Sequence, residues 1–247
     1  MPLIHRLHIF LFCLASFIDI NESASSIFGS IEHDFTTVKY SNTTLDSKSF
    51  LNACKQYVKI YDTLGGGTKL VKRDILSNIK KIEELTAHNG TSNIFEIITK
   101  EVLHIKNSTT FESSASESRQ IRNLPPKTVS SALLWLNRGF HLFHSVFTKI
   151  IEGEENLVEA FQTSYDKILS KFHSRFIRFT IRRALGWVGD LDSLILESCL
   201  WKDLEEDKRN CDKVIIVQEL EDYINGMQEL MTVVDNCFEK YGLTDAY

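Results

Sequence analysis

The stretch "RDILSNIKKI", residues 73–82, carries two stripes of side chains along one predicted helix. Apolar residues recur in and just before it at the spacing of a helix that buries one face: Val71, Ile75, Ile79 and Ile82. Asp74, Asn78 and Lys81 follow the same spacing, so these polar side chains also point in one common direction. An acceptor, an amide and a cation on one helix face predict a site that both donates and accepts hydrogen bonds.

The helical period extends along most of the chain on both sides of this stretch. The expected helices span residues 47–61, 68–87, 94–105, 128–151, 154–172, 174–199 and 212–241, the sixth of them broken near Gly186 or Gly189. "LGGG", residues 64–67, is interpreted as a turn, because no phosphate-binding GKS or GKT follows it. No segment alternates with a period of two for long enough to predict a sheet. The sequence therefore predicts an all-α fold whose wide apolar helix faces pack in two layers.

The composition is that of an ordinary globular protein, with 247 residues of which 43% are hydrophobic and 25% are charged. The net charge of -5 is spread over both signs without long runs, so nucleic acid is not expected as a partner. Residues 107–124 depart from this average, because they are rich in Ser, Thr and Glu. They are expected to form a flexible loop on the surface of the domain.

The N-terminal residues 1–46 are expected to form an extension to a domain that spans residues 47–247. Within the extension, residues 1–24 resemble a short signal peptide, with a weakly basic start, an apolar run and small residues near Ala15. The apolar run is too short to cross a bilayer as a helix. The alternative is an apolar segment that packs on the core.

Sequons and cysteines bear on the compartment. Four N-glycosylation sequons are consistent with secretion: Asn21, Asn42, Asn89 and Asn107. Four cysteines follow the leader-like segment: Cys54, Cys199, Cys211 and Cys237. Their even number is compatible with disulfides, but their spacing matches no recognisable framework, so their pairing is left open.

Motifs for catalysis are weak. His141 and His144 lie on one predicted helix, but no acidic residue completes a zinc motif with them. The chain contains no CxxC pair for metal or redox chemistry, and no GxSxG around a nucleophile. The two histidines are therefore expected to be ordinary helix residues. We expect a protein that is not an enzyme and that needs no metal or cofactor.

Three motifs, taken in this order, resemble the glycolipid transfer protein family. The first is the stripe itself, since the family motif Asp-x-x-x-Asn-x-x-Lys matches Asp74, Asn78 and Lys81. The second is "LWLNRG", residues 134–139, and the third is His173 in "SKFH". The resemblance covers the whole expected domain.

This resemblance implies a two-layer helical sandwich of about eight helices that binds a sphingolipid. In this fold a polar surface site binds the headgroup, and an apolar tunnel takes the hydrocarbon chains. By the resemblance, Asp74, Asn78, Lys81 and Trp135 bind a sugar headgroup, while Asp74 and His173 bind the ceramide amide. The expected function is non-enzymatic transfer of a glycosylceramide between membranes through transient surface contact. The family resemblance implies the cytoplasm, and secretion is the alternative.

Several apolar residues are candidates for the tunnel lining: Phe140, Phe143, Val146, Phe147, Phe176, Ile177 and Leu185. The alternative is that most of them fill the core. Arg175 stands where the glycolipid type has a tryptophan that is thought to contact membranes. Docking is therefore expected to use Arg175 and neighbouring lysines on anionic lipid rather than aromatic insertion.

The ceramide-1-phosphate transfer branch of the same family is the near alternative. That branch has a cation in place of the Asn and arginines in place of the Trp and of the residue one turn earlier. This chain has the neutral residues Asn78, Trp135 and Ser131 at those positions. The C-terminal "EKYGLTDAY" resembles the phosphate branch, and four cations lie close to the motif: Lys72, Arg73, Lys80 and Arg138. A ceramide-1-phosphate carrier, a sphingolipid sensor and a helical scaffold without transfer activity therefore stay as alternatives.

Overall fold

The computed structural model describes residues 26–32, 34–108, 124–202, 204, 206 and 211–246. Its α-helices are α2 Ser47–Ile60, α3 Lys69–Asn89, α4 Ile94–Ser108, α5 Val129–Ile151, α6 Leu157–Ile168, α7 Arg175–Leu185, α8 Leu191–Cys199 and α9 Lys213–Tyr241. Short 3₁₀ turns lie at Phe35–Thr37 (η1), Gly66–Thr68 (η2) and Ser170–Phe172 (η3). The described residues form no strand, so the predicted all-α fold is confirmed. The leader-like residues 1–24, Asn21 and most of the expected loop lie outside the described residues.

The helix ends follow from local capping. Asp46 accepts a hydrogen bond from the Ser49 N–H at 2.9 Å and so begins α2, as Thr128 does for α5. α3 ends at Asn89 and is capped by Gly90, which has a φ of 64° and takes the left-handed conformation. The expected break in residues 174–199 is confirmed, because α7 ends at Leu185 and α8 begins at Leu191.

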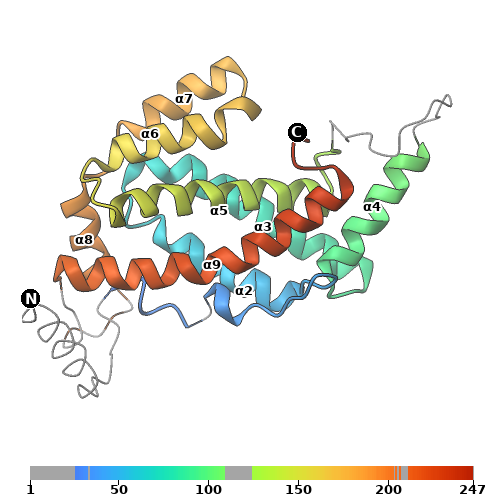
Figure 1. Cartoon of the computed structure of the whole chain (residues 1–247), viewed down its shortest axis with the longest axis horizontal. Helices are drawn as coiled ribbons and strands as arrows, with labels where there is room; N and C mark the ends of the chain where they lie inside the picture. Colours follow the sequence, from blue (N-terminus) through green and yellow to red (C-terminus); the bar gives the residue numbers. More distant parts are fainter. Residues whose placement is uncertain are drawn as a thin grey trace, which may run out of the picture.

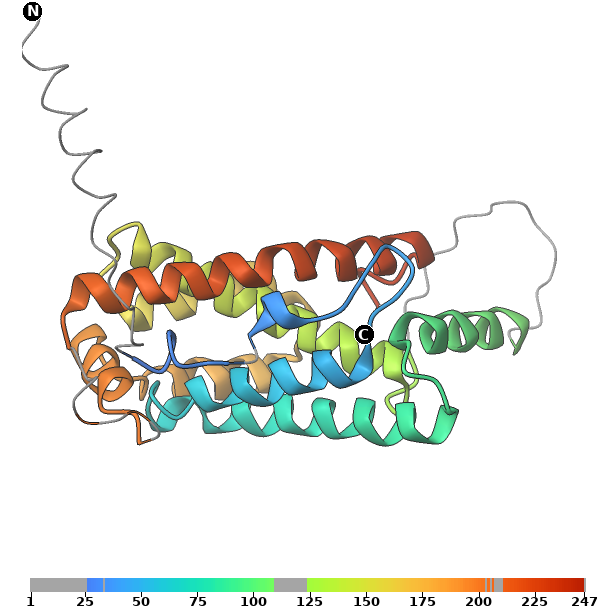
Figure 2. The ribbon, with the colours of Figure 1, turned by 90° about the horizontal axis from the view of Figure 1, so that it is seen from below.

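The long apolar helix α5 lies at the centre of the molecule. It packs against α3, α6 and α9, while α2 packs against α3. Figure 1 shows α6 and α7 side by side above α5, with α8 toward the left and α4 at the right end. In Figure 2, α2 and α3 run together beneath α9, which gives the two layers of the sandwich. No described helix is both long and apolar enough to cross a membrane.

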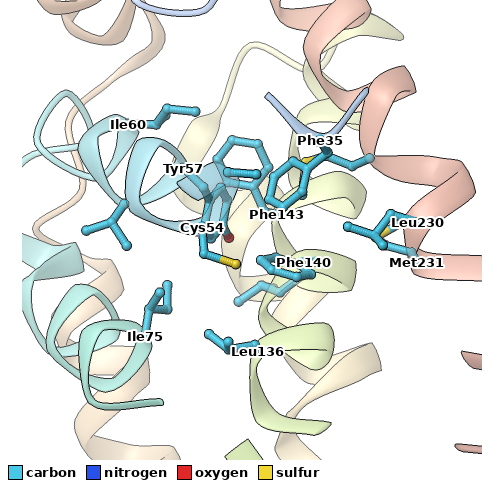
Figure 3. Close-up of a cluster of buried hydrophobic side chains, with 14 of the residues drawn as sticks. Phe35, Cys54, Tyr57, Ile60, Ile75, Leu136, Phe140, Phe143, Leu230 and Met231 are labelled. Carbon is cyan, nitrogen blue, oxygen red and sulfur yellow. The ribbon is translucent and has the colours of Figure 1, made fainter. Parts of the chain in front are cut away.

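An aromatic cluster fills the core between α2, α5 and α9 (Figure 3). The Phe140 ring lies edge-on to Phe35 at 5.0 Å and to Tyr57 at 5.2 Å between ring centroids. Phe143 packs on Phe147 at 4.3 Å, and all of these side chains are buried. Such edge-to-face pairs add roughly 0.5–1.5 kcal/mol each to the burial of their area.

This cluster separates core residues from tunnel candidates. Of the residues proposed for the lining, four are packed core side chains instead: Phe140, Phe143, Val146 and Phe147. The described part of the N-terminal extension also belongs to the core, because Ile27, Phe28 and Phe35 are buried in it. Residues 26–46 are therefore not separate from the helical domain.

Candidate functional site

The polar stripe of α3 forms a short hydrogen-bonded chain. Lys81 Nζ donates to Asn78 Oδ1 at 3.3 Å, and Asn78 Nδ2 donates to Asp74 Oδ2 at 3.2 Å. The three side chains therefore lie on one face, as the spacing predicts. Among the described residues, Asp74 keeps its Oδ1 as an acceptor and Lys81 keeps further N–H groups as donors.

Asp74 is held in an environment that disfavours its charge. Partial burial raises the pKa of the Asp74 carboxyl above its ordinary value, while the charge of Lys81 and the hydrogen bond from Asn78 lower it by less. Folding therefore gains nothing from keeping this carboxylate ionised. A charge that the fold does not favour is typical of a functional site.

Trp135 on α5 and His173 after η3 form the opposite wall. Their rings stack at 5.3 Å between centroids with 5° between the planes. His173 Nδ1 lies 2.9 Å from the Tyr165 hydroxyl, so its Nε2 is the nitrogen left for a ligand. Burial, and then the charge of Arg138, lower the pKa of His173 below its ordinary value. The imidazole is therefore neutral near pH 7.

One cavity of about 880 Å³ brings these residues together. All five side chains named for the site from the sequence line it: Asp74, Asn78, Lys81, Trp135 and His173. Apolar side chains from α3, α5, α6 and α7 form most of the remaining wall: Ile75, Leu142, Phe161, Leu169, Ile181 and Leu185. Phe176 and Ile177 also line it, so three of the seven tunnel candidates fall here. The cavity thus combines a polar group of side chains with a largely apolar wall.

Arg138 lies next to the site, and the sequence analysis gave it no role there. Its guanidinium is buried, and one nitrogen donates to the carbonyls of Thr244 at 3.0 Å and Ala246 at 2.6 Å. The same group lies 3.4 Å over the Phe172 ring, and burial lowers its pKa to about 10. Arg138 therefore ties the C-terminal segment to α5 next to Trp135. In the sequence, only its position in the motif "LWLNRG" indicated that Arg138 lies near the site.

The first turns of α7 expose large apolar side chains beside the cavity. Phe176 is 78% exposed and Phe179 is 65% exposed, and Trp187 just after the helix is 69% exposed. Arg175 is exposed on the same helix. Three exposed aromatic rings therefore lie near Arg175, whereas the sequence analysis expected docking through Arg175 and lysines; that expectation stays a prediction. The sequence signal was the alternation of apolar and cationic residues in "RFIRFTIRR", residues 175–183.

The two histidines considered for metal binding lie elsewhere on α5. His141 Nε2 contacts Asp235 Oδ2 on α9 at 2.9 Å, and His144 Nδ1 lies 3.3 Å from the Thr148 hydroxyl of its own helix. The described residues contain no group of three or more His, Cys, Asp or Glu that could hold a metal ion.

An all-α fold with a cavity that is lined by both polar and apolar side chains is typical of proteins that bind amphipathic ligands. The family model for glycolipid transfer protein matches residues 45–199, which is more than half of the chain. The chain belongs to the glycolipid transfer protein family, whose members are lipid transfer proteins rather than enzymes.

Curated relatives agree with this assignment. The chain is 25% identical to pleckstrin homology domain-containing family A member 8 of Danio rerio, over 90% of its own length and 38% of that protein's. It therefore spans about two fifths of the length of the first relatives it matches. It is 27% identical to a glycolipid transfer protein of Aureobasidium melanogenum, over 62% of this chain and 68% of that one.

Solved structures share the fold. The structure that explains how FAPP2 selects simple glycosphingolipids superposes with a TM-score of 0.68 at 21% identity, covering 87% of this chain and 96% of that one. Human ceramide-1-phosphate transfer protein bound to its lipid superposes with a TM-score of 0.66 at 14% identity, covering 90% and 99%. At these identities the likeness shows the fold and leaves the ligand open.

Proposed function

We propose that this chain binds a glycosylceramide and transfers it between membranes. The observation that carries the proposal is one cavity that is lined by apolar side chains and also by Asp74, Asn78, Lys81, Trp135 and His173. A ligand that suits both parts has a polar headgroup and long hydrocarbon chains. Moving such chains through water costs about 0.8 kcal/mol for each exposed methylene, so a carrier must enclose them.

A sugar headgroup matches the polar side chains of the cavity. Its hydroxyls donate and accept hydrogen bonds, and the chain from Lys81 through Asn78 to Asp74 offers both functions. The indole of Trp135 provides a broad flat surface for the C–H face of a sugar ring. A bound sugar would replace contacts that the three α3 side chains make with one another.

The ceramide amide matches the pair of Asp74 and His173. Asp74 would accept from the amide N–H. When the Tyr165 hydroxyl donates to Nδ1, the neutral His173 carries its proton on Nε2 and can donate it to the amide carbonyl. A lipid without this amide would leave both groups without a ligand partner, which weakens its binding.

Ceramide-1-phosphate is the second candidate, because family neighbours include carriers of that lipid. A phosphate requires converging cations, whereas the wall positions equivalent to those cations are Ser131 and Trp135. The nearby cations are engaged in several ways. Lys72 pairs with Asp62, Lys80 pairs with Glu84 at 3.6 Å, and Arg138 binds the C-terminal carbonyls, while Arg73 lines the cavity. Among the described residues, Arg73 and Lys81 are the cations that line the cavity, while the neutral Asn78, Ser131 and Trp135 in the same wall favour the glycolipid.

Membrane contact is proposed for the α7 surface, defined as Arg175, Phe176, Phe179 and Trp187. It lies beside the cavity and combines exposed aromatic rings with a cation. Aromatic rings suit the interface between headgroups and acyl chains, and the arginine suits anionic lipid. A lipid could then pass between the membrane and the cavity without crossing water.

The test is transfer of fluorescent galactosylceramide and of ceramide-1-phosphate between vesicles, for the wild type and for Asp74→Val and Trp135→Ala. We expect transfer of the glycolipid, and its loss in both variants while circular dichroism shows them folded. Transfer of the phosphate lipid alone would replace the proposed ligand by ceramide-1-phosphate. Transfer of neither lipid by a folded protein would favour a sensor or a helical scaffold.

A further inference from the structure

Three sequons of the chain present their asparagines to solvent. Asn42 is exposed in a turn closed by a hydrogen bond from the Ser41 N–H to the Thr44 carbonyl at 2.8 Å. Asn89 is the exposed last residue of α3, and Asn107 is exposed in the last turn of α4. A glycan on each asparagine could therefore project into solvent without disturbing the core.

The existing contacts of Asn89 are compatible with a glycan. Its Nδ2 donates to the Leu85 carbonyl at 2.7 Å. An asparagine amide has two N–H groups, and a glycan replaces only one of them. The hydrogen bond to Leu85 can therefore persist in a modified chain.

The three asparagines lie toward the same end of the molecule. Asn93 Nδ2 donates to the Thr43 carbonyl at 3.2 Å, which joins the turn of Asn42 to the connection that follows Asn89. Asn107 lies on α4, the helix that begins at this connection. Figure 1 places α4 at the right end of the molecule, away from α7 at the upper left. Glycans here would leave the cavity and the α7 surface uncovered.

A disulfide is the second, independent observation. Cys199 at the end of α8 is bonded to Cys211 just before α9, with 5.3 Å between their Cα atoms. Disulfides persist in secreted proteins and are rare in the reducing cytosol. The described residues also include two free cysteines, Cys54 and Cys237, both of which are buried. Burial raises the pKa of both thiols, to about 11 for Cys237, so they are protected from oxidation.

We propose that Asn42, Asn89 and Asn107 carry N-linked glycans, in a chain whose Cys199–Cys211 disulfide forms in the same oxidising compartment. In glycan transfer, the asparagine Nδ2 bonds to the anomeric carbon of an oligosaccharide, releases one proton and displaces the pyrophosphate of a lipid-linked donor. In disulfide formation, two thiols lose two protons and two electrons to the disulfide of a protein oxidant, which becomes a dithiol. The protein then acts on the lumenal or extracellular side of membranes. The cytoplasmic location implied by the family stays the competing prediction.

The experiment uses the full chain expressed in eukaryotic cells and treated with peptide-N-glycosidase. We expect a loss of mass on treatment, with conversion of the modified asparagines to aspartates found by peptide mass spectrometry. Asn42→Gln and Asn107→Gln should each lower the mass of the untreated protein by about one glycan. The matched controls Thr43→Ala and Ser108→Ala keep their sequons and should keep every glycan.

Alkylation of the denatured chain without reductant tests the cross-link. Cys54 and Cys237 should be labelled, while Cys199 and Cys211 should be labelled only after reduction. A chain whose mass equals that of its unmodified sequence would overturn the proposal. A disulfide found without any glycan would overturn it as well, because the three asparagines would then have remained unmodified in an oxidising compartment.

Discussion

Trp135 stacks on His173 with 5° between the ring planes, and both rings line the same cavity. The surface proposed for the sugar and the donor proposed for the ceramide amide are thus one packed unit. If the proposed ligand binds here, a change in either ring should affect both the headgroup contact and the amide contact.

Trp135→Ala should reduce glycolipid transfer about tenfold or more, because ring contacts of roughly 0.5–1.5 kcal/mol are lost on both the ligand and His173. Trp135 is only partly buried, so the variant should lose less stability than the roughly 3–5 kcal/mol of a fully buried aromatic residue. Vesicle transfer and urea unfolding measure the two effects.

The neighbouring Leu136→Ala is the matched control. Leu136 is 1% exposed and packs in the core, so its truncation should cost about 2–5 kcal/mol in the free energy of unfolding. The folded fraction of this variant should still transfer lipid. A scaffold without a ligand site would instead show no transfer by the wild type or by either variant.

Asp74→Asn should leave the free energy of unfolding unchanged or slightly raised, because burial already disfavours the ionised carboxyl. Glycolipid transfer should fall roughly 10-fold to 100-fold, since the ligand N–H loses its charged acceptor. Urea unfolding and vesicle transfer test the pair of effects. A variant that is clearly destabilised and still transfers lipid would assign Asp74 to the fold and not to the ligand.

The sequence was sufficient for the polar stripe, because the helical period alone decides that Asp74, Asn78 and Lys81 share a face. It was not sufficient for the meeting of Trp135 with His173, which lie on different elements and were grouped only through the family resemblance. The stacking of their rings depends on how α5 and η3 pack, and no local pattern encodes that contact.

Core and cavity residues were also inseparable in the sequence. Phe140 and Phe176 have the same chemistry, yet one is buried in the aromatic cluster and the other is 78% exposed on α7. Their difference depends on which helix covers each face. Arg138 was missed for a related reason, because it binds backbone carbonyls, and a carbonyl leaves no signal in the sequence.

Acidification should destabilise the fold partly through His173. Its pKa lies below the ordinary 6.5, so in the window between the two values the unfolded chain binds more protons than the folded one. The free energy of unfolding therefore falls as the pH falls through this window. His173→Gln should lose less stability than the wild type in urea unfolding as the pH is lowered through 6.5 and below.

Two other groups bear on that comparison. Burial and the charge of His141 also lower the pKa of His144, so some of the dependence should remain in the His173 variant. Asp74 acts in the opposite direction. Because its pKa is raised in the folded state, the folded chain binds more protons than the unfolded chain in a pH window above 3.8. The free energy of unfolding therefore rises as the pH falls through that window. If the free energy of unfolding depends on pH equally in the His173 variant and in the wild type, the burial of a neutral His173 is contradicted.

The glycine turn before α3 sets the position of the α7 surface. The Gly67 N–H donates to the Trp187 carbonyl at 3.3 Å, and a Cβ on Gly67 would overlap the Ala184 carbonyl and lie 2.8 Å from the Val188 nitrogen. Gly67→Ala should therefore push the end of α7 away from α3, at a cost of about 1–3 kcal/mol. Glycolipid transfer should fall as well, because Trp187 and α7 would shift relative to the cavity.

Gly66→Ala is the matched control, since nothing lies within 4 Å of the added Cβ. This variant should keep transfer and be as stable as the wild type or more stable, by up to about 1 kcal/mol, because alanine restricts the unfolded chain. Urea unfolding with transfer rates from anionic vesicles distinguishes the two positions. If Gly67→Ala unfolds at lower urea but transfers lipid at the wild-type rate, the α7 surface does not need its present position for membrane contact.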